Sequence, residues 1–64
     1  MKVMNHTEYP KSLRSKSESE LRSIISDCHE VITLQKDFNP NIGYYEDEIH
    51  YCAMEITRRR KSSK

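Results

Sequence analysis

Apolar residues recur at steps of three and four along two stretches of the chain, and a cluster of turn residues separates the stretches. The first stripe consists of Leu21, Ile24, Ile25, Cys28, Val31 and Ile32. The second consists of Tyr45, Ile49, Cys52, Ala53 and Ile56. This spacing places each stripe on one face of an α-helix. The pattern predicts an all-α fold with helices over residues 17–36 and 44–60.

The expected helix ends carry matching polar signals. Ser17 and Glu20 have the spacing of a capping box, in which each side chain accepts a hydrogen bond from a backbone N–H of the other residue. Residues 37–43 contain Pro40, Gly43 and two asparagines, which are typical of a turn. Acidic residues lie near the start of the second helix and basic residues near its end, as the helix dipole favours. Because the loop is short, the two helices should form an antiparallel hairpin.

The two ends of the chain are less regular. The Tyr9-Pro10 dipeptide favours an extended backbone, since proline disfavours the helical region for the residue before it. We therefore predict an extended arm over residues 1–11, a short turn or helix over residues 12–16 that points Leu13 inward, and a frayed basic tail over residues 61–64. Within the loop, Phe38 and Ile42 are expected to fold back over the open end of the hairpin.

The composition leaves little material for a core. The 64 residues form one domain, of which 34% are hydrophobic and 33% charged, with one Phe and no Trp. A chain of this size buries only about 60% of the surface that its unfolded form exposes. We therefore expect further burial against a second copy or another protein, most simply as a homodimeric helical bundle.

A second apolar set lies on the other side of the second helix. Tyr44, Tyr51 and Met54 follow one another at steps of seven and three, and Tyr51 points roughly opposite Ile49. One partner helix cannot cover both faces. Either residues 1–16, with Tyr9 and Leu13, cover this second set, or it is an intermolecular surface, since Tyr and Met are enriched at interfaces. The second interpretation predicts protein-binding residues at Tyr9, Tyr44, Tyr51 and Met54.

Candidate chemistry is sparse. Cys28, His29, His50 and Cys52 are metal-ligating residue types, but residues one or two apart on a helix do not face the same side. Neither Cys-x-x-Cys nor His-x-x-x-His is present, so we predict buried free thiols and no metal or cofactor. Glu46 and His50 stand four apart, as in an ordinary surface pair. We predict no catalytic residue, because no nucleophile with its base and no phosphate-binding glycine loop is present.

The charge pattern leaves one alternative function open. The formal net charge is +1, which gives no overall attraction to nucleic acid, and no apolar run is long enough to span a membrane. A reducing compartment with free thiols is the expectation, since two cysteines make no disulfide scaffold and no signal sequence is recognised. A basic cluster of Arg58, Arg59, Arg60 and Lys61 could bind phosphates, so a nucleic-acid accessory role is the alternative.

The sequence also resembles a family. The stretch Gly43-Tyr44-Tyr45-x-Asp47-Glu48-x-His50-Tyr51, together with Tyr9-Pro10, the Ser12–Ser17 stretch, Asp27-Cys28 and Arg58-Arg59, is similar to small uncharacterised accessory proteins of tailed bacteriophages. The likeness covers about residues 9–60. It implies an accessory phage product, made in a bacterial cytoplasm, that binds and modulates a host or phage protein. It implies no catalytic residue. The expectation is therefore a non-enzymatic interaction protein.

Overall fold

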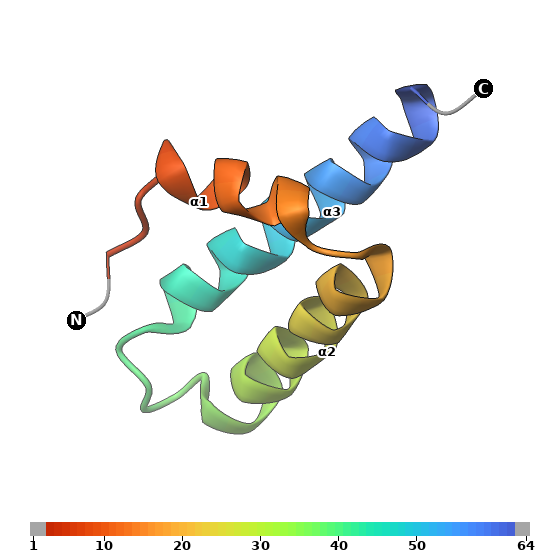
Figure 1. Ribbon diagram of the computed structural model, residues 1–64. Helices are drawn as coiled ribbons and strands as arrows, with labels where there is room; N and C mark the ends of the chain where they lie inside the picture. The colour runs from red at the N-terminus through yellow and green to blue at the C-terminus, as the bar shows by residue number, and fades with distance from the viewer. Residues whose placement is uncertain (1–2, 63–64) are drawn as a thin grey trace.

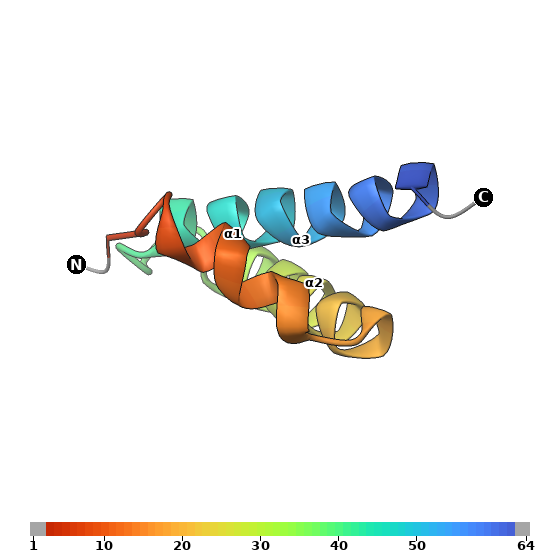
Figure 2. The ribbon, with the colours of Figure 1, turned by 45° about the horizontal axis from the view of Figure 1, so that its top comes forward.

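A helical hairpin with a third segment packed along one side makes up the structure, a computed structural model that describes residues 3–62. The elements in order are α1 (Glu8–Ser12), a 3-10 helix η1 (Leu13–Ser15), α2 (Glu18–Gln35) and α3 (Ile42–Ser62). Figures 1 and 2 show α2 running antiparallel to α3, and the N-terminal segment crossing α3 obliquely. The predicted all-α hairpin is confirmed, and the molecule measures 43 × 22 × 15 Å.

The first long helix begins at the predicted capping box. The backbone N–H of Glu20 donates to the Ser17 hydroxyl at 3.1 Å, and the backbone N–H of Ser17 donates to the Glu20 carboxylate at 2.9 Å. These bonds hold the pKa of the Glu20 carboxyl below its ordinary value, chiefly through the Ser17 backbone. They satisfy two amides that no helical carbonyl can reach, which fixes where α2 starts.

The connecting loop is organised by asparagine side chains. The amide nitrogen of Asn39 donates to the Gln35 side chain at 2.8 Å, and its oxygen accepts the backbone N–H of Asn41 at 2.8 Å. These bonds close the turn within the loop itself. Phe38 is 73% exposed, so the expectation that it folds over the end of the hairpin is wrong.

The N-terminal segment differs from the predicted extended arm. Helix α1 begins at Glu8 and contains Tyr9 and Pro10, because Pro10 lies in the first turn, where a missing backbone N–H costs no helical bond. The side chain of Asn5 accepts the backbone N–H groups of Thr7 and Glu8 at 3.0 and 2.9 Å, and so supports the start of the helix.

The core joins all three parts of the chain. Leu13, Leu21 and Cys52 are fully buried, Ile56 packs with them, and Met4 and Cys28 are also buried. Leu13 points inward, as its place in the sequence predicted. Because Met4 and Leu13 come from the N-terminal segment, that segment belongs to the core of the domain.

The C-terminal end is more regular than predicted. Helix α3 continues through Lys61 to Ser62, whose hydroxyl donates to the Arg58 carbonyl at 3.0 Å. The prediction of a frayed tail is therefore wrong for residues 61–62, and residues 63–64 lie outside the described part. Figures 1 and 2 show the last turn of α3 extending beyond the start of α2. Among the described residues, no helix has the length and apolar content needed to cross a bilayer.

The capping box at Ser17 should contribute measurably to the stability of the fold. Replacing Ser17 with Ala should lower the free energy of unfolding by about 1 kcal/mol, because the N–H of Glu20 loses its acceptor. Ser19→Ala, two positions further in the exposed first turn, is the matched control and should be neutral or slightly stabilising. Urea unfolding followed by circular dichroism measures both variants, and equal losses would contradict a capping role.

Candidate functional site

The N-terminal segment covers part of the second apolar face of α3. The Tyr51 ring lies 6.2 Å from the Tyr9 ring and 5.8 Å from the His6 ring, centroid to centroid. The Tyr51 hydroxyl and His6 Nδ1 share a hydrogen bond of 2.8 Å. Tyr9 turns further inward, and its hydroxyl donates to the Glu48 carboxylate at 2.8 Å. Burial, and next this bond, raise the pKa of Tyr9 well above its ordinary range. Tyr9 is therefore mainly a packing residue.

Beside the N-terminal segment, a shallow depression remains exposed. It is formed by residues of that segment and of α3. We call it the composite face; its residues are Pro10, Arg14, Tyr51, Met54, Glu55 and Arg58. Met54 is 54% exposed, Tyr51 is half-buried, and Pro10 of α1 closes one side. Arg14 places positive charge beside these apolar groups, and the Arg58 guanidinium there is paired with the Glu55 carboxylate. The depression measures about 280 Å³, which suits one or two protruding side chains better than a whole small-molecule ligand.

Tyr44 does not belong to this face. It lies on the first turns of α3, half-buried, with its ring 5.8 Å from the Tyr45 ring in an edge-to-face arrangement. The structure thus brings together Tyr51 and Met54 of the predicted binding residues. It places Tyr9 against Tyr51 and leaves Tyr44 two helical turns away.

A buried carboxylate ties the N-terminal segment to α3. Glu55 is only 7% exposed, and its carboxylate accepts bonds from Arg58 at 2.8 and 3.1 Å and from Arg59 Nε at 2.8 Å. These two guanidinium groups, that of Arg58 first, hold the pKa of Glu55 at about 2. Arg59 Nη2 in turn reaches the carbonyl oxygens of Leu13, Arg14 and Lys16, at 2.6 Å for the last. Arg59 therefore caps the end of η1. We call this group the Glu55–Arg59 latch.

This latch divides the predicted phosphate-binding cluster. Arg59 is only 27% exposed, and its Nε and Nη2 groups donate to acceptors within the chain. Arg58 is paired with Glu55. Within residues 3–62, Arg60 and Lys61 have no ion-pair partner. Two of the four cations are thus structural, which weakens the charge available for nucleic acid.

The cysteines lie where the helical spacing placed them. Cys28 and Cys52 are buried free thiols, whereas His29 and His50 are exposed. Burial raises the pKa of Cys28 to about 11 and raises that of Cys52 as well, so neither thiol is activated as a nucleophile. In the described part of the chain, no three His, Cys, Asp or Glu residues gather closely enough to hold a metal ion.

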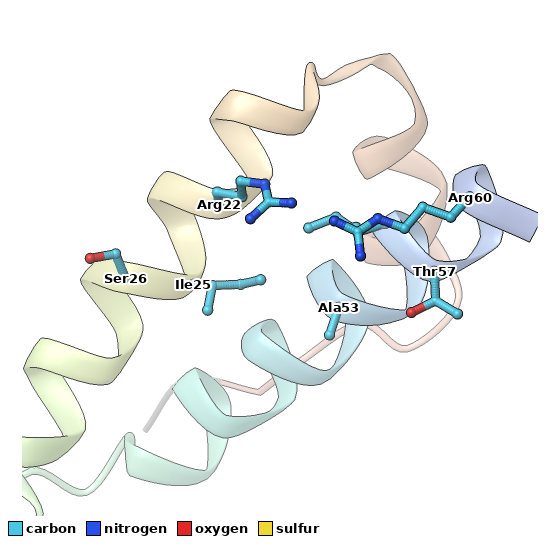
Figure 3. Close-up of a pocket in the computed structure, with 7 residues that line it drawn as sticks. Arg22, Ile25, Ser26, Ala53, Thr57 and Arg60 are labelled. Carbon is cyan, nitrogen blue, oxygen red and sulfur yellow. The ribbon is translucent and has the colours of Figure 1, made fainter. Parts of the chain in front are cut away.

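A second depression lies between α2 and α3. We call it the open groove; Figure 3 shows its lining, which comprises Arg22, Ile25, Ser26, Ala53, Ile56, Thr57 and Arg60. Ile25 and Ala53 form its apolar floor. The guanidinium groups of Arg22 and Arg60 point toward one another from the two helices (Figure 3). Arg22 is already paired with Glu18 at 2.9 Å. An anion that met both arginines would relieve their mutual repulsion.

Neither the latch nor the open groove was predicted from the sequence. A signal for the latch was present, because Glu55 stands three and four residues before Arg58 and Arg59, the spacing of helical ion pairs. The reach of Arg59 to η1 had no such signal, since it spans more than forty residues. Comparison with known protein families, with curated proteins and with solved structures found no match to this chain.

Removing the Arg59 side chain should separate the N-terminal segment from α3. Arg59→Ala leaves the carbonyl oxygens of η1 and the buried Glu55 carboxylate without this donor, so we expect a loss of about 1–3 kcal/mol in the free energy of unfolding. Lys61→Ala is the control on the same helix and should change it by less than about 0.5 kcal/mol. Urea unfolding measures both, and a similarly small effect of Arg59→Ala would refute the latch.

The low pKa of Glu55 makes stability depend on acidity. Because its pKa is about 2 when folded, against an ordinary 4.5, its contribution is fully present above pH 4.5 and is lost as the pH falls toward 2. In Glu55→Gln, stability should fall less steeply between these values than in the parent chain. Glu30→Gln, at an exposed position of α2, should keep the parent slope. Urea midpoints measured across this range test it, and an unchanged slope in Glu55→Gln would count against it.

Proposed function

We propose that this chain is a non-enzymatic interaction protein that binds and modulates another protein through the composite face. The observation that carries the proposal is the exposed Met54 beside the half-exposed Tyr51, framed by Pro10 and by two arginines. Methionine adapts its shape to a partner, and tyrosine and arginine contribute much of the binding energy at protein interfaces.

The proposal also specifies the partner's chemistry. An apolar side chain would fill the depression over Met54 and Tyr51, and a nearby carboxylate would meet Arg14 or the exposed edge of Arg58. The composite face is preformed, because the latch and the packing of Tyr9 hold the N-terminal segment in place against α3. Preformed surfaces lose little conformational entropy on binding, which favours affinity from a small contact.

The setting is part of the proposal. The resemblance of residues 9–60 to small phage accessory proteins favours a product made in a bacterial cytoplasm, acting on a host or phage protein. Such a protein needs no catalytic group, and modulation would follow from occupying a surface of its target. The nucleic-acid role is the weaker candidate. Arg59 is bonded to Glu55 and to η1, and the Nε and Nη2 groups of Arg58 are bonded to Glu55, so these groups are not free to bind phosphates.

Binding should depend on the composite face and not on exposed apolar groups in general. Met54→Glu should abolish specific capture of a protein from bacterial lysate and weaken binding of the purified partner by at least about tenfold, because it places a charge in the contact. Leu34→Glu is the matched control: Leu34 is 66% exposed on α2, away from the face, and should leave binding unchanged.

Two results would contradict the proposal. One is equal capture by the parent chain and by Met54→Glu. The other is capture of nucleic acid alone, with an affinity that falls steeply with salt and further on neutralising Arg60 and Lys61, which would favour the accessory role.

A further inference from the structure

The exposed side of α3 carries one regular ridge that the composite face does not use. The ridge consists of Glu46, His50, Ala53, Thr57 and Arg60, all exposed and spaced four, three, four and three residues apart. This spacing aligns the five side chains on one side of the helix. Ala53 stands at the centre, with an acid seven residues before it and a base seven residues after it.

We propose that two copies of the chain associate through this ridge, with their α3 helices antiparallel and a twofold axis at Ala53. The pairing goes beyond the proposed function, because none of the five ridge residues belongs to the composite face, whose Met54 and Arg58 border the ridge. Residues two apart on a helix differ by about 200°, so Ala53 and Tyr51 point in nearly opposite directions. The N-terminal segment covers the Tyr51 side and leaves the ridge uncovered.

The charges at the two ends of the ridge favour a second copy of the chain as its binding partner. A twofold axis at Ala53 brings together positions equally distant from it, so Glu46 of each copy meets Arg60 of the other. Arg60 has no ion-pair partner within residues 3–62. A parallel arrangement would instead place Glu46 against Glu46 and Arg60 against Arg60, which like charges disfavour. The ridge is therefore self-complementary in one orientation only.

The open groove provides the matching shape. It runs along the ridge between α2 and α3, and Ile25, Ala53 and Ile56 are the apolar residues of its lining. The small side chains of Ala53 and Thr57 allow two helices to approach closely, so that the ridge of each copy enters the groove of the other. In that position the incoming Glu46 carboxylate reaches the converging guanidinium groups of Arg22 and Arg60 (Figure 3). The acid of one copy thus pairs with Arg60 of the other, beside Arg22 and its partner Glu18.

Sedimentation equilibrium of the full chain tests this pairing through charge exchange. The parent chain should be dimeric at tens of micromolar at low salt. Glu46→Arg or Arg60→Glu alone should raise the dissociation constant by about tenfold or more, and the double variant should return it to within about threefold of the parent value. Lys11→Glu, an exposed charge reversal on α1, is the control and should leave the dimer intact.

A second variant addresses the axis itself. Ala53→Glu places two like charges at the centre of the pairing and should give a monomer that retains the helical circular dichroism of the parent. A parent chain that stays monomeric at these concentrations overturns the proposal. So does a dimer indifferent to Ala53→Glu, or one that the double exchange fails to restore. Oligomeric mass is the readout here and capture of a foreign protein is the readout for the composite face, so failure of one is distinct from failure of the other.

Discussion

The attachment of the N-terminal segment to α3 is the constraint on which the rest of the structure depends. A two-helix hairpin encloses little. Among residues 3–62 the largest fully buried side chains are Leu13, Leu21 and Cys52, and Leu13 belongs to that segment. The Glu55–Arg59 latch fixes η1 at the place where Leu13 enters the core. Replacing a buried ion pair with apolar groups can be neutral, but removing one partner leaves an uncompensated charge. The latch therefore specifies the position of the segment more than it adds stability.

Fixing the segment also creates the surface to which we assign binding. Pro10 and Arg14 lie beside Tyr51 and Met54 only because α1 and η1 pack against α3. Without them Tyr51 would be one ring on an exposed helix, with no depression beside it. Folding of the N-terminal segment therefore also forms the binding surface. Of the latch, Arg59 lies outside the composite face and acts on it only through the position of η1, whereas Glu55 lines the face.

The sequence predicted the parts of the fold that depend on neighbours along the chain. The capping box at Ser17, the helical period of the apolar stripes and the turn at Asn39 operate over a few residues, and α2 and α3 begin and end close to the predicted positions. The prediction was wrong at α1. There the preference of Tyr9-Pro10 for an extended backbone is outweighed by the hydrogen bonds to the Asn5 side chain and by burial of Leu13. Contacts between residues far apart in the chain, such as the bonds from Arg59 to η1, produce no periodic pattern in the sequence and could not be predicted from it.

The two open sides of α3 differ in what they can recognise. The composite face is asymmetric, with apolar groups at its centre and cations at its edge, so it complements a surface unlike itself. The ridge carries an acid and a base at equal distances from Ala53, so it complements itself when reversed. A helix with one face of each kind can pair with its own copy and still present two composite faces outward. The pair would then bind two target molecules, or one twofold target, with an effective concentration that a single copy lacks.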